Sequence, residues 1–287
     1  MDIKQAQKEM ERIQAEIMKL QMEYAANPTP ENAMIMQQKI MILSQEALKV
    51  SAMSSSDDDN EVNINADDFF VVDEQAIKDF VAAHPVPEDQ KKYLLIGGIL
   101  IATHDEPWQC FALMEEAGYW QSVLDGGWGI GKVAAGRKML ESLLEGRHEA
   151  RYGNDYRKFK AGQPHKLDED GVEGYVDTLE SFKEEIPSLL PYAQKCNTLL
   201  AWDLERVGYL ARIFRGLGWI DDAEMLDWIK KAAKAIKDNF SLWEEYVVSI
   251  LIGRAVAYNF DYSVVGTARE VLDSAKDILK KYPISSL

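Results

Sequence analysis

The first 53 residues carry apolar side chains at alternating spacings of three and four. The first run is Ile3, Ala6, Met10, Ile13, Ile17, Leu20 and Tyr24, and the second is Ala33, Met36, Ile40, Leu43, Ala47 and Val50. This heptad spacing predicts two helices, each with a narrow apolar seam of the coiled-coil type. Between the runs, the segment Asn27 to Asn32 (NPTPEN) ends one helix and starts the next. The pattern therefore predicts an antiparallel helical hairpin.

Four further apolar residues widen the second predicted helix beyond a two-helix seam. They are Met34, Ile35, Met41 and Ile42. An apolar arc of this width needs another partner, and methionine adapts to surfaces that fit inexactly. The partner could be the body of the same protein, a second copy of the chain, or a different protein. These four residues are our candidates for a partner interface.

Residues 54–68 (SSSDDDNEVNINADD) interrupt the helical pattern. They are polar and acidic, which is typical of a linker or exposed loop. We therefore expect three parts: a Met-rich hairpin at residues 1–53, an acidic linker at 54–68 and a globular domain at 69–287. A short strand is possible at Phe69 to Val72.

Beyond residue 68 the apolar spacing is helical almost throughout, and no repeat of 20 to 50 residues is evident. Alternating β patterns are scarce. The fold class predicted is all-α, a multi-helix globular bundle behind the hairpin. The helices expected are Glu74 to Ala83, one starting near Glu88, Gln109 to Leu124, Lys132 to Tyr152, Trp202 to Gly216, Ala223 to Asn239, Leu242 to Phe260 and Thr267 to Tyr282.

Composition and charge narrow the classes of function. The chain has 287 residues, 47% of them hydrophobic, with 32 Lys and Arg against 48 Asp and Glu, a net charge of −16. This charge repels phosphate backbones and anionic lipid, so nucleic acid is not expected as the main ligand. Cys110 and Cys196 are far apart and suit a reducing compartment. The charged N-terminus does not read as a signal peptide, and the longest apolar stretch, Tyr93 to Ala102, is too short to span a bilayer. We expect a soluble, cytoplasmic protein.

Two motif searches yield no cofactor or metal prediction. Gly126 to Val133 (GGWGIGKV) imitates a phosphate-binding loop, but it lacks the Ser or Thr after the lysine, and a helical pattern precedes it where a strand is required. The glycines are better explained as the end of one helix and the turn into another. The histidines, His84, His104, His148 and His165, show no metal-ligand spacing. We expect neither cofactor nor metal.

The segment Lys132 to Lys160 is a basic island in an acidic protein. It contains eight Lys or Arg residues, interleaved with Tyr152, Tyr156 and Phe159. Proteins commonly bind RNA or a phosphorylated ligand by combining cationic side chains with aromatic side chains on which bases stack. The more conservative interpretation is internal charge balance with the acidic stretch from Asp168 to Glu185.

The strongest constellation combines tryptophans with acids and arginines on two predicted helices. Its members are Trp202, Asp203, Arg206, Trp243, Glu244 and Arg254. Asp203 and Arg206 are three apart and share a helix face, which favours an ion pair. In one interpretation Asp203 with Arg206 or Arg254 is a buried clasp that fixes helix packing. In the other, Asp203 and Glu244 are acid–base groups and Arg206, Arg254, Trp202 and Trp243 bind a ligand.

The same residues carry a resemblance to a known family. The order W-D-x-x-R, then G-W-I at Gly218 to Ile220, then S-x-W-E-E-Y and G-R resembles a bacterial family catalogued as domain of unknown function 1266, over about residues 95–262. Trp128 to Ile130 and Glu145 to His148 resemble its upstream segments, although Arg147 here precedes His148. The resemblance implies a mainly helical domain with no assigned activity, and it supplies no catalytic residues.

These observations leave three functions open. The first is a non-enzymatic protein–protein interaction module, of immunity or adaptor type, that binds a basic partner through its acidic surface and the Met-rich hairpin. The second is an enzyme of unrecognised class with its site on the Trp-Asp and Trp-Glu helices. The third is a scaffold that self-assembles through residues 1–53.

Overall fold

The computed structural model describes residues 74–287, together with Arg12, Ile13 and Lys19. The chain divides into two compact units, Met1–Phe70 and Val71–Leu287, and the description below concerns the second. Most of the predicted hairpin, the acidic linker at 54–68 and the possible strand at Phe69 to Val72 lie outside the described residues. The same holds for the four interface candidates, Met34, Ile35, Met41 and Ile42.

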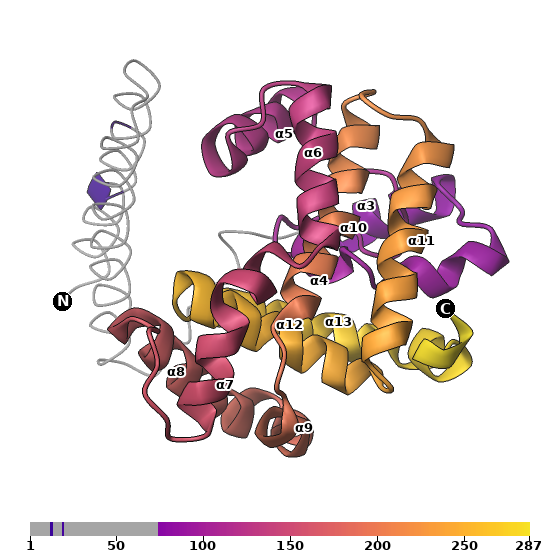
Figure 1. Cartoon of the computed structure of the whole chain (residues 1–287). Helices are drawn as coiled ribbons and strands as arrows, with labels where there is room; N and C mark the ends of the chain where they lie inside the picture. Colours follow the sequence, from indigo (N-terminus) through magenta and orange to yellow (C-terminus); the bar gives the residue numbers. More distant parts are fainter. Residues whose placement is uncertain (1–11, 14–18, 20–73) are drawn as a thin grey trace. The chain divides into compact units, whose positions relative to one another are not determined.

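All regular structure in the described part of the second unit is helical, which confirms the all-α prediction there. The helices, labelled as in Figure 1, are α3 (Glu74–Ala83), α4 (Gly98–Ala102), α5 (Ala117–Val123), α6 (Val133–Leu144), α7 (Asn154–Lys160), α8 (Glu169–Glu185), α9 (Leu190–Lys195), α10 (Leu200–Gly216), α11 (Asp222–Asn239), α12 (Trp243–Tyr258) and α13 (Tyr262–Lys281). Shorter helical turns lie at Glu88–Tyr93, Leu124–Trp128 and Glu149–Gly153.

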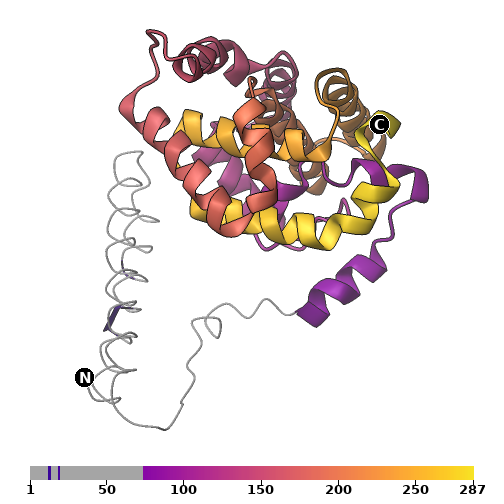
Figure 2. The same cartoon turned by 90° about the horizontal axis from the view of Figure 1, so that it is seen from below.

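Helix α10 is the centre of the bundle. It packs against α4, α6, α11 and α12, and every residue from Ala201 to Phe214 is buried. Helix α8 lies against α12 and α13, and α13 also contacts α4. In Figure 1, α6 and α11 flank α10 while α12 crosses below it, and Figure 2 shows the same bundle turned by 90°. Because α10 is surrounded on all sides, any charged side chain on it must find its hydrogen-bond or ion-pair partners inside the protein.

Aspartates start three of the longer helices. Asp168 accepts a hydrogen bond from the backbone N–H of Gly171 (2.9 Å) at α8, and Asp221 accepts one from Glu224 (2.8 Å) at α11. Asp261 does the same at α13. Each carboxylate satisfies an N–H that has no partner in the first helical turn, which fixes where the helix begins.

The prediction of a helix from Gln109 to Leu124 is wrong over its first half. The chain is irregular up to Glu116, and α5 begins at Ala117. The buried Glu106 carboxylate accepts the backbone N–H groups of Met114 (2.6 Å) and Glu115 (2.7 Å), which folds this segment into a turn. Of the apolar residues that suggested a helix, Cys110, Phe111 and Ala112 are buried in direct succession, without the spacing of a helical face.

The segment from Lys132 to Tyr152, which was predicted to be one helix, forms two separate helical elements. Helix α6 ends at Leu144, and Gly146 has φ +77°, a left-handed conformation that ends helices and that glycine adopts without strain. A helical turn that includes Glu149–Gly153 then leads into α7. Helix α3 has the expected bounds, and α10, α11 and α12 lie within two residues of theirs, whereas α13 starts at Tyr262 rather than Thr267. Helix α8 was expected only as an acidic stretch.

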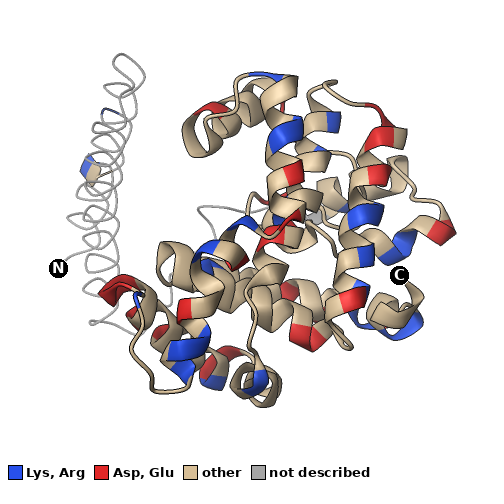
Figure 3. Cartoon of the chain, viewed as in Figure 1, with Lys and Arg blue, Asp and Glu red and all other residues tan. Residues whose placement is uncertain are grey.

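Several charged residues on the described surface form ion pairs with one another. Arg137 forms an ion pair with Glu224 (2.7 Å), and Arg157 forms one with Glu149 (2.5 Å), whereas Glu185 pairs with Arg269. The ion pairs among the described residues do not join the basic island to Asp168 to Glu185, although Tyr156 and Phe159 contact Tyr175 of α8. The charge balance between these segments stays a prediction. Figure 3 shows acidic and basic residues side by side along the helices. No helix in the described residues has the length and apolar character needed to cross a membrane.

Candidate functional site

Helix α10 carries four buried charged residues, Asp203, Glu205, Arg206 and Arg212. An α-helix turns by about 100° per residue, so residues three or seven apart share a face and residues two apart point to nearly opposite sides. Asp203 and Arg206 therefore form one polar cluster, and Glu205 and Arg212 form another. The first is called the open cluster and the second the sealed cluster, for reasons given below.

The sealed cluster is built around the fully buried carboxylate of Glu205. It accepts hydrogen bonds from the backbone N–H groups of Gly97 (2.8 Å), Ile99 (2.9 Å) and Leu100 (3.2 Å), and from the hydroxyl of Tyr246 (2.9 Å). Three of these donors belong to the first turn of α4. Glu205 thus caps α4 from the side of another helix, and burial raises its pKa.

Arg212 completes the sealed cluster on the same face of α10. Its Nη2 donates to the carbonyl oxygen of Leu94 (2.5 Å) and its Nη1 to that of Cys110 (3.4 Å). Burial lowers the pKa of Arg212 to about 10, and the Glu205 charge opposes that shift. Because these partners are backbone groups and buried side chains, this cluster holds the bundle together and presents no group to a ligand.

Two glycines allow the close approach on which the sealed cluster depends. Gly97 has φ +82°, and a Cβ placed there would lie 2.2 Å from the backbone nitrogen of Tyr209. A Cβ at Gly208 would lie 2.3 Å from the carbonyl oxygen of Ile96. The backbones of α10 and the segment before α4 therefore touch directly, which brings the Glu205 carboxylate to the N–H groups of α4.

The open cluster is centred on Asp203, whose carboxylate accepts four hydrogen bonds. Its Oδ2 accepts the backbone N–H groups of His148 (2.8 Å) and Glu149 (3.0 Å). Its Oδ1 accepts from Nδ1 of His148 (2.9 Å) and Nη2 of Arg206 (3.1 Å). Asp203 therefore fixes both the helical turn that carries His148 and the orientation of the imidazole ring.

These contacts bear on which ring nitrogen of His148 carries the proton. When Nδ1 donates to Asp203, the other ring nitrogen, Nε2, can accept the hydroxyl proton of Tyr258, at 3.0 Å. Nη2 of Arg206 lies 2.5 Å from Nδ1, and because a guanidinium only donates, this contact favours the opposite tautomer, with the proton on Nε2. Burial lowers the pKa of His148, and the Arg206 charge adds to that effect while Asp203 opposes it. Burial thus favours the neutral ring, and a relay from Asp203 to Tyr258 requires the tautomer with its proton on Nδ1.

Tyr258 connects this cluster to the surface. It is the last residue of α12, and its side chain is 53% exposed. Its oxygen accepts a hydrogen bond from Nη1 of Arg206 (3.1 Å) and lies 3.0 Å from Nε2 of His148. The hydrogen-bond chain therefore runs from the buried Asp203 through His148 to a phenol in contact with solvent.

Arg206 is clamped between two indole rings. Its guanidinium carbon lies 4.8 Å from the ring centre of Trp202 and 5.2 Å from that of Trp128. Trp128 also stacks on Tyr209, at 6.0 Å between ring centres. Burial lowers the pKa of Arg206. Cation–π contact with these two rings compensates part of the lost hydration and keeps the guanidinium beside Asp203.

The structure brings some of the sequence candidates together and separates others. Trp202, Asp203 and Arg206 meet in the open cluster. Arg254 lies at its edge, 5.5 Å from the ring of Tyr258, where it pairs with Asp261 (3.1 Å) and not with Asp203. Glu244 and Trp243 begin α12, about 20 Å along the helix from Tyr258 at 1.5 Å per residue. Trp243 donates its indole proton to the carbonyl of Tyr282 there.

Sequence reasoning missed three members of the open cluster: Trp128, which was noted only for its family motif, and His148 and Tyr258. His148 is 55 residues from Asp203 and 110 residues from Tyr258, so no local spacing links them. The one available signal was the similarity of the segment Glu145 to His148 to a family motif, and that similarity pointed to no role.

Comparison with known proteins places this geometry in a family. The chain matches the family model described as "Protein of unknown function (DUF1266)" over residues 123–282, more than half of its length. The chain belongs to this family. All six residues of the open cluster, Trp128, His148, Trp202, Asp203, Arg206 and Tyr258, lie within the matched segment. No curated protein and no solved structure matches the chain.

The W-G-I segment of this DUF1266 protein is a turn between helices. Helix α5 and the helical turn Leu124–Trp128 precede the glycines, Gly129 has φ +62°, and α6 begins at Val133. A phosphate-binding loop follows a buried strand instead. In the described residues, no group of three His, Cys, Asp or Glu side chains is arranged to hold a metal ion.

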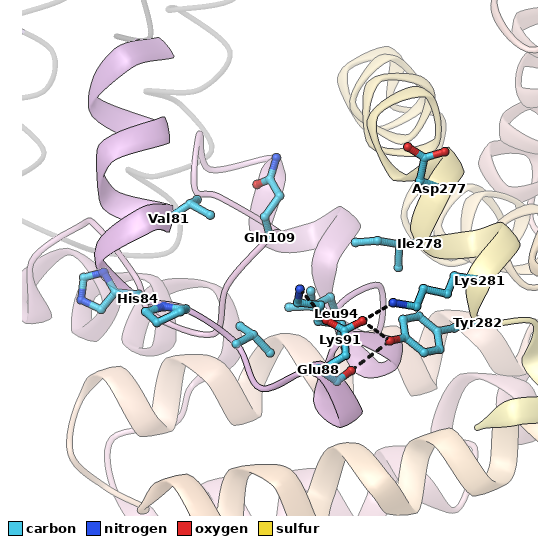
Figure 4. A pocket seen from close by; sticks show the side chains of 12 residues that line it. Val81, His84, Glu88, Lys91, Leu94, Gln109, Asp277, Ile278, Lys281 and Tyr282 are labelled. Atoms are coloured by element: carbon cyan, nitrogen blue, oxygen red, sulfur yellow. Dashed lines mark hydrogen bonds and ion pairs between the residues drawn. The ribbon is translucent and has the colours of Figure 1, made fainter.

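A shallow pocket of about 420 Å³ lies elsewhere on the DUF1266 protein, between α3, the turn Glu88–Tyr93 and α13 (Figure 4). Its charged groups engage one another: Glu88 accepts hydrogen bonds from Lys281 and from the hydroxyl of Tyr282 (2.5 Å), and Lys91 pairs with Glu88 at 2.8 Å. Together these donors lower the pKa of Glu88 to about 2. The pocket therefore offers a paired, structural set of charges, and the open cluster is the better functional candidate.

Proposed function

We propose that the helical body of this DUF1266 protein is an acid–base catalyst and that Tyr258 is the group that exchanges a proton with the substrate. The observation that carries the proposal is the continuous relay from Asp203 through His148 to Tyr258. A buried carboxylate that orients a neutral histidine, which in turn faces a hydroxyl at the surface, is the arrangement by which hydrolases activate a hydroxyl.

The relay defines where each proton and charge goes. The Tyr258 proton passes to Nε2 of His148, which leaves a phenolate that Arg206 stabilises through Nη1. The imidazolium formed is stabilised by Asp203, which keeps its hydrogen bond to Nδ1. The phenolate then accepts a proton from the substrate, which restores the phenol. Tyr258 donates this proton to another atom of the substrate while His148 returns the first proton to Tyr258, so that the phenol and the neutral imidazole are both restored. The clamp of Trp128 and Trp202 on Arg206 holds the stabilising charge in place.

The proposal predicts that Tyr258 is an unusually reactive tyrosine. An aryl sulfonyl fluoride reports this, because the phenolate oxygen displaces fluoride from sulfur and leaves a stable ester that mass spectrometry locates. Tyr262 is a matched control in the same chain, since it is 56% exposed and its hydroxyl donates to Glu185, a hydrogen bond that raises its pKa. We expect Tyr258 to react at least about ten-fold faster than Tyr262, at the lower end of the effect of a positioned base.

The variant His148→Gln tests whether Tyr258 reacts because His148 activates it or only because it is exposed. It removes the base while Tyr258 stays on the surface, so labelling of Tyr258 should fall to the rate of Tyr262, and labelling of Tyr262 should not change. Circular dichroism checks that the variant is folded. Equal rates at the two tyrosines in the wild type, or labelling of Tyr258 that is indifferent to His148→Gln, would refute the acid–base proposal.

A second function, partner binding through residues 1–53, is supported by the sequence. The net charge of −16 and the apolar arc of Met34, Ile35, Met41 and Ile42 suit a basic protein partner, or a second copy, in the cytoplasm. Replacing all four residues by Ser in the full chain tests this proposal. We expect the wild type to show a larger mass by light scattering, alone or with a captured protein, and the variant to lose it. Identical masses and empty eluates from both proteins would contradict it.

A further inference from the structure

Two arginines beside the open cluster have no carboxylate partner. Arg147 and Arg151 are exposed, lie four residues apart and flank His148 in the same helical turn. Arg147 donates only to the sulfur of Met139 (3.1 Å), a weak acceptor, and the guanidinium of Arg151 lies 4.8 Å over the ring of Tyr152. That ring is 6.1 Å from the imidazole of His148. Among residues 74–287, neither arginine has a carboxylate within ion-pair distance.

The other charges around the open cluster cancel in pairs. Arg206 faces Asp203, Arg254 faces Asp261, and Arg157 faces Glu149. The positive charges of Arg147 and Arg151 therefore remain uncompensated next to the relay, in a protein whose total charge is −16. A local positive potential on an acidic protein draws anions to that place in particular.

Two buried donors inside the cluster also lack an acceptor. They are Nε of Arg206, a side chain that is 3% exposed, and Nε1 of Trp202, which is 5% exposed. They stand four residues apart on α10, with the guanidinium 4.8 Å from the indole ring. Nε of Arg212 in the sealed cluster lacks an acceptor as well. Of the two clusters, however, only the open one has two such donors on neighbouring side chains and a half-exposed member, so an oxygen atom of a ligand is the acceptor that we consider for them.

The segment that covers Arg206 lies at the protein surface. Trp128 is only half-buried, and it follows Gly126 and Gly127, where an added Cβ would meet nothing within 4 Å. These two glycines are therefore not required by packing. A displaced Trp128 ring would uncover the face of the guanidinium that it now covers at 5.2 Å.

From these observations we infer that the ligand of the open cluster carries an oxyanion, a phosphate or carboxylate group, that Arg147 and Arg151 attract and that Arg206 and Trp202 bind. The inference rests on the proposed function, since it names the substrate class of the same site. Guanidinium groups pair with such oxygens through two parallel hydrogen bonds, and an oxyanion supplies the acceptors that the two buried donors lack. Its bound oxygens would lie within reach of the Tyr258 hydroxyl.

Inorganic phosphate tests the inference directly, with acetate as a second probe at matched ionic strength. The readout is the indole N–H signal of Trp202 in 1H–15N NMR spectra, assigned with Trp202→Phe. We expect this signal to move downfield and saturate, because its proton gains an acceptor. The signal of Trp243, which already donates to the Tyr282 carbonyl, should stay in place. Whichever probe saturates at lower concentration identifies the preferred oxyanion.

Arginine variants show whether the site, rather than general charge, binds the anion. Each of Arg147→Gln and Arg151→Gln should weaken binding by about five-fold, since each removes one of the two positive charges that attract the anion to the site. Lys138→Gln is the matched control, because Lys138 is exposed, lies in the same basic island and has no ion pair. It should change binding by less than about two-fold.

The result that overturns the inference is a Trp202 signal that neither anion moves, or weakening by Lys138→Gln as large as that by the arginine variants. This result is independent of the labelling experiment. If Tyr258 reacts faster than Tyr262 but no anion binds, the acid–base proposal stands and the substrate class is wrong. If anions bind but Tyr258 is unreactive, the site is a binding site without proton transfer, and the acid–base proposal fails.

Discussion

The two polar clusters on α10 contain the same kinds of charged residue but differ in how those residues are connected to the surface. Each pairs a buried carboxylate with a buried arginine on one face of the helix. In the sealed cluster, Glu205 and Arg212 are satisfied mainly by backbone groups of the segment that includes α4, and nothing leads outward. In the open cluster, Asp203 and Arg206 are joined by His148 to the half-exposed Tyr258. The difference is where the hydrogen-bond chain ends.

This comparison shows that perturbed ionisation alone does not identify a functional site. Burial raises the pKa of Glu205 and lowers that of Arg212, although neither reaches a ligand. Burial also lowers the pKa of His148, in the cluster that does reach the surface. Structural and functional charge networks share this property, so the discriminating feature is a titratable group at the exposed end.

The largest effect is expected in the sealed cluster. Glu205→Ala leaves three backbone N–H groups and the Tyr246 hydroxyl without an acceptor and leaves Arg212 buried without its countercharge. We expect a loss of about 3–5 kcal/mol in the free energy of unfolding, measured by urea denaturation. Glu180→Ala is the control, because it removes only an exposed pair with Lys183 and should cost less than about 1 kcal/mol. Similar losses in both variants would mean that the sealed cluster is not structural.

Asp203→Asn should have a smaller effect on stability and a larger one on reactivity. Asn keeps the size and one oxygen acceptor, but its amide group opposes two of the four donors that converge on Asp203. We expect a loss of about 2–3 kcal/mol in urea, below that of Glu205→Ala, together with a loss of Tyr258 labelling. A variant that is destabilised yet labels Tyr258 at the wild-type rate would make the open cluster a second structural clasp.

The stability of the two clusters should also differ in its response to pH. His148 has a folded-state pKa below its ordinary value of 6.5 because it is buried. Its contribution is therefore fully present above pH 6.5 and is lost as the pH falls from there through the folded-state pKa, because the unfolded chain binds the proton first. Urea unfolding at several pH values should show this loss in the wild type.

His148→Gln provides the comparison for this pH dependence. The decline below pH 6.5 should be shallower in this variant, with a remainder from His104, whose pKa burial also lowers. Glu205, whose pKa is raised, acts in the opposite sense and is unchanged between the two proteins. Parallel curves for the wild type and His148→Gln would show that His148 is not held neutral.

The smallest effect on stability is expected for Tyr258→Phe. The ring remains at the end of α12, and the change removes only one hydroxyl at a half-exposed position, so unfolding should change by less than about 1 kcal/mol. Labelling at this position should nevertheless disappear. If Tyr258→Phe lowered the free energy of unfolding as much as Asp203→Asn does, Tyr258 would have a structural role.

The sequence predicted the pairs within α10 better than the partners of those pairs. The three-residue spacing of Asp203 and Arg206 was sufficient to predict their ion pair, because both residues lie on one helix. His148 and Tyr258 could not be predicted, since their positions depend on how the turn after α6 and the end of α12 pack around α10. Glu244 was chosen for its neighbours in sequence, and it lies at the far end of α12.

The helical pattern had the same limit. Regular spacing located α10, α11 and α12, whose apolar faces are continuous. It failed between Gln109 and Glu116, where the buried Glu106 carboxylate folds the chain by binding backbone N–H groups. A contact of that kind depends on a single side chain, so it produces no periodic pattern of apolar residues in the sequence.

The most direct test of the account is the protonation state of the His148 ring, read from 15N NMR of the imidazole near pH 7. We predict a neutral ring with its proton on Nδ1 and with Nε2 as an acceptor, and we predict that the Nε2 signal shifts in Tyr258→Phe while the Nδ1 signal stays in place. A proton on Nε2, or a ring protonated at both nitrogens, would break the relay from Asp203 to Tyr258 and contradict the account.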